Sequence, residues 1–424
     1  MKQRPARACL VAVSLAALIL VLASCPLVVR RAVYAPEYLG YDALRKGVAI
    51  TESRPLSQTG KIYIKGDYIF VNEYHEGVHV INNTDPAAPV VEAFITIPGN
   101  VDIAIRGNIL YADSYVDLVA LDIEDPANVL ELKRIKNAFE YPYFLPWLED
   151  EYDSDARYET IDEENGIVVG WEVSKTETVL LDQFDYGYRY MLMEAGVADG
   201  ASGGDTGTGG SMARFTIIGD YLYVVHSGYL QLVTIADPAD PNLWSKIAVG
   251  WDIETIFPYK DKLFIGSQSG MYVYDNVDPE NPTQICKFEH ATSCDPVVAT
   301  DTYAYVTLRS GTMCGGGSNQ LDVLDITDIE NPVLIKSYAM QGPYGLSVDG
   351  DILFVCDGVA GLKIYNVAVP QDISLIDAFQ TFPTYDVILN PPLAIVVGPQ
   401  GLYQYDYGNL ADIQLVSTLA VGSD

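Results

Sequence analysis

One short pattern recurs along the chain at a nearly constant interval, and it constrains the fold more than any other feature. The pattern is a two-residue turn followed by alternating apolar residues, as in GDYIFV at 66–71 and GDYLYV at 219–224. Its second turn residue stands at positions 67, 108, 220, 261, 302, 351 and 392. The interval is 41 residues four times, and the two longer intervals are 112 and 49. Repeats of this length are typical of solenoids and propellers.

Each repeat contains four short runs in which apolar and polar residues alternate. In the second repeat they are VDIAI (101–105), ILYADS (109–114), LVALDI (118–123) and VLELKRI (129–135). Alternation bounded by Gly, Asn, Asp and Pro indicates β-strands, and four antiparallel strands in about 40 residues make a propeller blade. An acid and a proline, as in DITDIENP at 325–332, are expected to turn the chain from the third strand to the fourth. Where the acid is replaced, in NVAVPQDI at 366–373, we expect a looser turn.

The third run of several repeats points to a known family. GVHVIN (77–82), LVALD (118–122), LDVLD (321–325) and LKIYN (362–366) resemble the core of LVIVD repeats, a family of bacterial β-propeller repeats. The resemblance extends over residues 60–424 apart from one insertion. It implies an exported protein with a binding or scaffold role, and it identifies no catalytic residue. We therefore predict an all-β fold, a seven-bladed β-propeller of four-stranded antiparallel blades.

The longest interval predicts an insertion between blades two and three, at residues 141–211. It is strongly acidic at 149–164, strand-like at 165–173 and rich in glycine at 198–211. This composition favours a surface excursion with one hairpin and a flexible glycine-rich tether. The alternative is an eighth blade hidden within the insertion.

The first 24 residues have the composition of a secretory signal peptide. Basic residues precede an apolar stretch, and LASC ends at Cys25. This resembles the lipobox of bacterial lipoproteins, which implies a lipid on Cys25, a membrane anchor and a place in the bacterial cell envelope, at the outer membrane or cell surface. The alternative is an uncleaved signal anchor. Residues 25–59 are expected to form an anchor and stalk.

The sequence leaves undecided which strand closes the ring. Residues 48–55 alternate well and are a candidate ring-closing strand at the outer edge of the last blade. That blade also has a candidate fourth strand of its own at 412–421, which would close the ring without them.

The charge balance excludes some partners. Lys and Arg total 25 against 57 Asp and Glu, a formal net charge of −32. Such a surface disfavours nucleic acid, whose phosphates need a basic partner, and anionic membrane surfaces. A protein or a glycan remains as the predicted ligand.

The topology of a propeller predicts which polar residues share a face. Loops between second and third strands lie on the same face as the connections between blades, and together they bring polar groups to the mouth of the channel. The candidate ligand-binding residues there are His75, Asp102, Asp113, Asp117, His226, His290, Asp295, Arg309, Asp357 and Asp386. The alternative is that these side chains only satisfy turn backbones.

The predicted activity is binding rather than catalysis. The alternative is an extracellular hydrolase or lyase that acts on a glycan through a carboxylate pair such as Asp102 and Asp295. No cofactor motif is present, and His75 and His79 stand across a hairpin, so we expect neither cofactor nor metal.

The remaining cysteines divide into two pairs. Cys286 and Cys356 lie in alternating runs and are expected to be free core thiols. Cys294 and Cys314 are expected to form a disulfide, because the glycine run after Cys314 lets its loop bend back toward the preceding connection.

Overall fold

The computed structural model describes residues 28–126, 128–141, 157–180, 198–200, 208–250, 253–267, 269–289, 296–310 and 318–422. They fall into two compact units, which we call the ribbon unit (within Met1–Tyr41 and Tyr143–Leu192) and the propeller unit (within Asp42–Pro142 and Met193–Asp424). Besides the short helix α2 (Tyr41–Leu44) and the 3-10 turn η1 (Glu163–Asn165), the regular elements of the described residues are strands. The predicted all-β class is confirmed.

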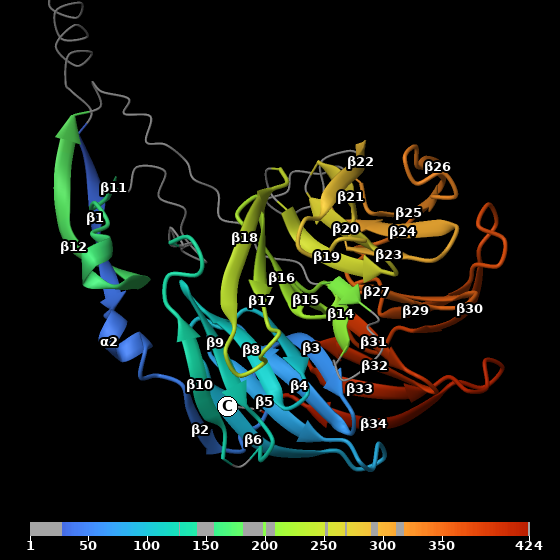
Figure 1. The fold of residues 1–424 in the computed structure, drawn as a ribbon, viewed down its shortest axis with the longest axis horizontal. Helices are drawn as coiled ribbons and strands as arrows, with labels where there is room; N and C mark the ends of the chain where they lie inside the picture. The colour runs from blue at the N-terminus through green and yellow to red at the C-terminus, as the bar shows by residue number, and fades with distance from the viewer. Residues whose placement is uncertain are drawn as a thin grey trace, which may run out of the picture. The chain divides into compact units, whose positions relative to one another are not determined.

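In the described residues the strands form eight sheets, and seven of them carry one repeat each. Within a repeat, four strands pair antiparallel in chain order, as the alternation predicted (Figure 1). Repeats one to four are β3 (Thr59–Lys65), β4 (Tyr68–Glu73), β5 (Gly77–Asn82), β6 (Val90–Thr96); β7 (Ile103–Arg106), β8 (Ile109–Ser114), β9 (Asp117–Asp122), β10 (Leu130–Ile135); β15 (Phe215–Ile218), β16 (Tyr221–His226), β17 (Tyr229–Thr234), β18 (Asn242–Ala248); and β19 (Ile253–Tyr259), β20 (Lys262–Ser267), β21 (Gly270–Asp275), β22 (Thr283–Glu289). Repeats five to seven are β23 (Val297–Ala299), β24 (Tyr303–Leu308), β25 (Gln320–Asp325), β26 (Val333–Ala339); β27 (Leu346–Asp349), β28 (Ile352–Cys356), β29 (Leu362–Asn366), β30 (Ser374–Phe379); and β31 (Asp386–Asn390), β32 (Leu393–Gly398), β33 (Gly401–Asp406), β34 (Gln414–Ala420).

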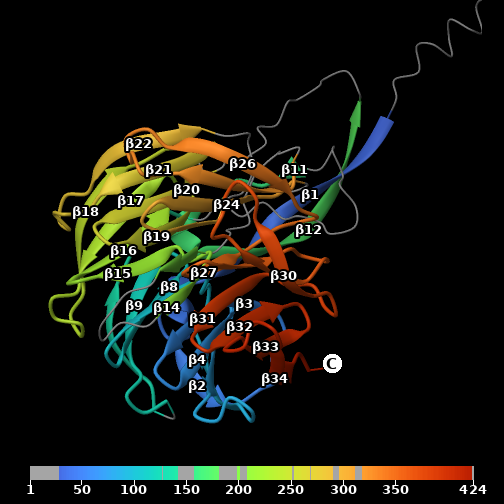
Figure 2. The ribbon, with the colours of Figure 1, turned by 90° about the vertical axis from the view of Figure 1, so that its right-hand side faces the viewer.

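The first strand of each repeat is its inner strand, and the inner strands contact one another in succession. The contacts run from β3 to β7, β15, β19, β23, β27 and β31, and β31 contacts β3 again. Figures 1 and 2 show the sheets following one another in the same order. This arrangement is a β-propeller.

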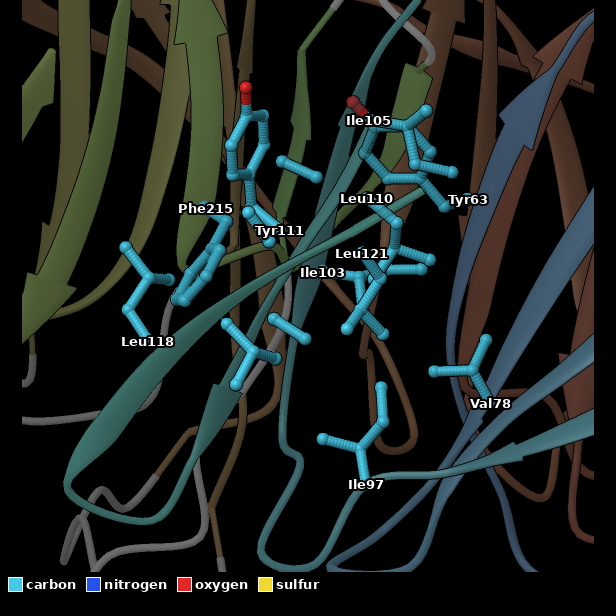
Figure 3. Packing of buried hydrophobic residues seen from close by; sticks show 14 of the residues in the cluster. Tyr63, Val78, Ile97, Ile103, Ile105, Leu110, Tyr111, Leu118, Leu121 and Phe215 are labelled. Carbon is cyan, nitrogen blue, oxygen red and sulfur yellow. The ribbon is translucent and has the colours of Figure 1, made fainter. Parts of the chain in front are cut away.

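Buried apolar side chains fill the spaces between neighbouring sheets. Figure 3 shows Tyr63 of β3, Leu118 of β9 and Phe215 of β15 in one cluster that draws on the first three repeats. The second and third strands are buried on both faces, which explains their nearly continuous apolar runs. Exposed residues concentrate on the fourth strands, such as β10.

Of the two alternatives for ring closure, residues 48–55 do not join the last sheet. The strand that forms there, β2 (Ala49–Glu52), pairs with β6 and extends the outer edge of the first sheet. The last sheet keeps its own fourth strand, β34. The segment before the first repeat meets the end of the last repeat through a parallel bridge between Leu56 and Val421. Buried amides of Asn83 and Gln404 also exchange hydrogen bonds of 2.9 and 2.7 Å.

The acid in the recurring turn works as predicted, but its loss does not loosen the turn. Asp328 accepts a hydrogen bond of 3.2 Å from the Glu330 backbone N–H. Val369 replaces this acid in the sixth repeat. The Asp372 N–H still donates to the Val369 carbonyl at 2.8 Å, against 3.0 Å for the Asn331–Asp328 pair. The prediction of a looser turn is therefore wrong, because the flanking strand ladders hold the backbone without the side chain.

The ribbon unit joins the predicted stalk to the predicted insertion. Strand β1 (Val28–Leu39) pairs antiparallel with β12 (Ile167–Leu180) and parallel with the short β11 (Arg157–Tyr158). The strand predicted at 165–173 therefore exists, but its partner comes from the N-terminal segment. A hairpin also forms from the insertion, between β13 (Ala198–Gly200) and β14 (Thr208–Ser211), and it belongs to the propeller unit.

Candidate functional site

Aligning the seven repeats on their turns places one equivalent residue at the start of each inner strand, five positions before the first turn residue. We call this set the hub residues. They are Lys61, Asp102, Arg214, Thr255, Pro296, Gly345 and Asp386. Four successive repeats carry charged hub residues of alternating sign. They are Asp386 in the seventh repeat, Lys61 in the first, Asp102 in the second and Arg214 in the third. The sequence prediction contained Asp102 and Asp386 but missed Lys61, which this alignment would have found.

Lys61 and Asp102 form a buried pair between the first two repeats. Their side chains are 5% and 2% exposed, and Nζ lies 3.4 Å from Oδ2. Burial lowers the pKa of Lys61, and the Asp102 charge opposes this. Asp102 also accepts the N–H of Ile103 at 2.8 Å and of Phe215 at 3.1 Å. Its carboxylate therefore ties the inner strand of the second repeat to that of the third.

Asp386 is engaged in a similar way, with a partner from the insertion. Its Oδ1 accepts the Val387 N–H at 2.9 Å and the Ser211 hydroxyl at 3.2 Å. The Ser211 Oγ in turn accepts the Leu346 N–H at 2.6 Å. Ser211 thereby links the inner strands of the sixth and seventh repeats.

The hairpin that supplies Ser211 occupies the space among the inner strands. β14, which is labelled in Figure 1, pairs with β3 and contacts β7, β27 and β31. β13 contacts β19 and β23. A side chain at Gly210 would overlap the Asp386 carboxylate, so glycine is required there. The glycine-rich end of the insertion, predicted to be a flexible tether, is a paired strand at 208–211.

The other candidate aspartates are buried and engaged with protein groups. Asp113 accepts the Val101 N–H at 2.7 Å, and burial raises its pKa. Asp117 bonds Arg45 Nε at 3.0 Å and the Asn137 N–H at 2.9 Å. Asp357 accepts the N–H of Gly342 at 2.8 Å and pairs with Lys363. For these three, the alternative of satisfied turn backbones describes the observed contacts.

Two candidate histidines lie in the loops that follow second strands, or at their edge, and burial lowers the pKa of both. The pKa of His75 falls to about 4. The pKa of His226 falls to about 3, where the nearby Arg214 charge adds to burial. Arg214 Nη2 lies 3.0 Å from His226 Nδ1. Both imidazoles are therefore neutral at neutral pH. His79 Nε2 instead lies 2.7 Å from Glu73 Oε1.

Aromatic rings gather in two groups, the first of them in the loops that follow β4 and β8. Tyr74 is 48% exposed, and its ring stacks on His75 with centroids 3.9 Å apart; Tyr115 lies 5.2 Å from His75. Both His75 and Tyr115 have positive φ, 63° and 54°, a strained conformation for such residues.

The second group combines the start of the loop after β24 with the connections that precede β27 and β31. The Arg309 guanidinium sits 3.9 Å from the centroid of the Tyr344 ring, and Tyr344 lies 5.2 Å from Tyr385. We call Tyr74, His75, Tyr115, Tyr344 and Tyr385 the rim aromatics, and Arg309 is the arginine that accompanies them. Polar residues drew attention to these loops in the sequence, and the clustering of rings became visible only in the structure.

Some predictions fall outside the described residues. These are the lipid on Cys25, the Cys294–Cys314 disulfide, His290 and Asp295. The two cysteines that the structure describes, Cys286 and Cys356, are free as predicted. In the described part of the chain, no helix is long and apolar enough to cross a membrane.

Comparison with known proteins identifies the repeat. The LVIVD repeat family matches residues 99–136 and 209–249. These segments carry the second and third repeats, on either side of the insertion.

Solved structures share the fold at low sequence identity. A protein from Lactobacillus plantarum has a TM-score of 0.56 and 12% identity over 86% of this chain and 96% of its own. The computationally designed protein Ika8 has a TM-score of 0.51 and 8% identity over 87% of this chain and 90% of its own. The periplasmic gluconolactonase PpgL of Pseudomonas aeruginosa has a TM-score of 0.50 and 11% identity over 85% of this chain and 97% of its own.

At such identities the likeness shows the fold alone. No curated protein matches the chain. The repeat match, the four-stranded sheets and the shared fold together show a β-propeller that carries LVIVD repeats.

Proposed function

We propose that the protein is a seven-bladed propeller, held at the bacterial cell envelope by a lipid on Cys25, whose rim aromatics bind a glycan. The blade count is supported by the circle of contacts among the seven inner strands of the described residues. The anchor is supported by LASC after a basic and apolar leader in residues 1–24.

The choice of binding surface rests on what occupies the space among the inner strands. The hairpin β13–β14 fills the space among the inner strands, and Asp102 and Asp386 already bond protein groups. A ligand is then left with the surrounding loops, where the rim aromatics lie. A carboxylate pair that includes Asp102 would need to break these bonds first, so no observation favours the hydrolase or lyase alternative.

The chemistry of the rim suits a sugar. Tyr and Arg present flat faces with polar edges, and such side chains dominate the energetics of many binding surfaces. The strained backbone of His75 and Tyr115 costs of the order of 1–3 kcal/mol each, and strain of this kind concentrates at functional sites. In the third and sixth repeats the corresponding turns place Ser227 and Gly358 at positive φ.

The test is binding of the purified chain to an array of bacterial envelope glycans and, separately, to envelope proteins. We expect glycan binding that Tyr74→Ala or Arg309→Ala reduces at least tenfold, as expected for loss of about 1.4 kcal/mol. The matched control is Trp244→Ala, because Trp244 is 52% exposed on the outer strand β18, away from the loops. Binding to proteins alone, or equal effects of all three variants, would contradict the proposal. Mass spectrometry of the mature N-terminus tests the lipid independently.

A further inference from the structure

Among the rim aromatics and Arg309, only Arg309 has a side chain that is charged at neutral pH. His75 is neutral there, because burial lowers its pKa to about 4. Burial also raises the pKa of Tyr115 to about 12, so this phenol keeps its proton. Whether the rim prefers a neutral or a charged ligand therefore depends on the Arg309 guanidinium.

The Arg309 guanidinium lies over a ring and leaves its hydrogen-bond donors available. It sits 3.9 Å from the centroid of Tyr344, and it forms no hydrogen bond or ion pair within the part of the chain that the structure describes. The contact with the ring uses the flat face of the guanidinium, so the N–H groups at its edge remain directed outward. The other arginines of the propeller unit bond carboxylates or other protein acceptors; they are Arg45, Arg54, Arg106, Arg134 and Arg214.

The backbone holds Tyr344 in place under the guanidinium. The Tyr344 N–H donates to the Cys356 carbonyl at 2.7 Å, and the Tyr344 carbonyl accepts the Thr307 hydroxyl at 2.7 Å. A Cβ at Gly358 would lie 3.2 Å from Cε2 of the Tyr344 ring, so the Gly358 backbone borders this ring. The platform for Arg309 is therefore formed before a ligand arrives, which lowers the entropic cost of binding.

The neighbouring ring of Tyr385 is positioned in the same manner. Its N–H donates to the Val397 carbonyl at 2.8 Å, and its carbonyl accepts the Gly345 N–H at 2.9 Å. The rings of Tyr344 and Tyr385 are half-buried, with centroids 5.2 Å apart. Two positioned rings beside a guanidinium offer apolar contact to a sugar ring and a positive charge to a group at its edge.

The acidic character of the chain does not cancel this charge. The formal net charge is −32, but exposed charges that lie more than about 8 Å away are largely screened at physiological salt. The carboxylate that bonds the Gly342 N–H, two residues before Tyr344, belongs to Asp357. Asp357 is 0% exposed and is already paired with Lys363. A guanidinium in direct contact with an anion therefore outweighs the distant acids.

We infer that the glycan bound at the rim is acidic, and that a carboxylate of the kind found in uronic acids bonds the Arg309 guanidinium while the sugar rings lie against Tyr344 and Tyr385. The inference rests on the proposed glycan binding and adds the class of sugar. A guanidinium matches a carboxylate through two parallel hydrogen bonds. One guanidinium balances the single charge of a carboxylate, whereas a phosphate monoester carries about 1.5–2 negative charges at pH 7.

The experiment compares each acidic sugar with a neutral form of the same sugar. The probes are oligosaccharides of glucuronate, galacturonate and mannuronate, the methyl esters of these oligosaccharides, and phosphorylated hexoses. Calorimetry with the full chain at physiological salt measures each affinity. We expect at least one uronate to bind at least tenfold more tightly than its ester. Absence of this preference overturns the inference, as does tighter binding of a phosphorylated hexose than of any uronate.

Two arginine variants separate direct contact from overall charge. Arg309→Met removes the guanidinium and keeps an apolar stem on Tyr344, so it should weaken uronate binding at least tenfold and leave binding of the ester unchanged. Arg106→Met is the matched control, because it removes the same charge at the end of β7, where Arg106 pairs with Asp220. It should leave both affinities unchanged. Equal losses of uronate affinity in the two variants would overturn the inference, and thermal unfolding checks that both variants fold.

The neutral probes separate failure of the inference from failure of the proposed function. Binding of esters and other neutral glycans without a preference for the acids overturns the inference and leaves glycan binding at the rim standing. A chain that binds none of these glycans, acidic or neutral, overturns both.

Discussion

The propeller sheets and the ribbon are built from the same antiparallel strands, yet their side chains are used differently. In the propeller, each second and third strand is buried on both faces by the neighbouring sheets, as Leu118 of β9 illustrates. In the ribbon, backbone pairing runs the whole length of β1, but Val173 remains exposed. The comparison teaches that strand pairing sets the register, whereas burial between sheets supplies most of the stability.

The same contrast applies to charge. The buried hub places Lys61 and Asp102 against each other inside the protein, where each needs a partner. In the ribbon, charged side chains such as Lys175 are largely exposed, and exposed charge pairs contribute little to stability. Substitutions in the two regions should therefore have very different costs.

The largest expected effect comes from a cavity in the propeller. Leu118→Ala should lower the free energy of unfolding of the propeller unit by about 2–5 kcal/mol, because the side chain is fully buried. Trp171→Ala in the ribbon should change that free energy by less than about 0.5 kcal/mol in water. Denaturant titration followed by far-UV circular dichroism measures both. Equal effects would mean that the ribbon and the propeller unfold as one cooperative body.

The hairpin in the hub should be the next most sensitive element. Gly210→Ala places a methyl group against Asp386 and should cost about 1–3 kcal/mol. Gly342→Ala is the control, because nothing lies near the position of its Cβ and its φ is not positive. Thermal unfolding compares the two variants. If Gly210→Ala is as stable as the control, β14 is not packed in the hub.

Acid should weaken the propeller through His226. Its pKa is lowered from 6.5 to about 3 in the folded state. As the pH falls from 6.5 toward 3, the unfolded chain therefore binds a proton that the folded chain does not. The free energy of unfolding should decrease over this range by at most about 1.4 kcal/mol per pH unit from this residue. His226→Gln should make the decrease shallower in denaturant titrations across that range. An unchanged slope would show that the imidazole is not held neutral.

The smallest effect should come from a turn. Val369→Asp would introduce the acid that the first five repeats use, on a backbone that already has the right hydrogen bond. We expect a gain of about 0.5–1 kcal/mol from the added bond to a backbone N–H. Differential scanning calorimetry measures it. A loss of stability would mean that the sixth turn differs from the others in a way that the Asp372–Val369 bond does not reveal.

Much of the fold could be predicted because it is local and repeated. The short apolar run that contains Leu118, Val119 and Ala120, together with the turn at Gly107, predicts paired strands without knowledge of any distant contact. The contacts of the candidate site could be predicted less well from the sequence. Asp357 directly follows β28, whereas Asp113 lies inside the end of β8 and not in the loop after it. Their hydrogen bonds to Val101 and Gly342 depend on how distant segments fold back.

By itself the sequence determined the strands, the repeat, the positions of the turns and the segment from which the insertion comes, because these follow from periodicity and from turn chemistry within a few residues. Only the tertiary structure decided the partners of the long-range segments. A strand such as β2, β12 or β14 has the same local pattern whichever edge it joins. The choice of β6, β1 and β3 depends on which edge is within reach and on contacts that the pattern does not encode, such as Gly210 against Asp386. The physical reason is that backbone hydrogen bonds are nearly the same on every edge, so packing selects among them.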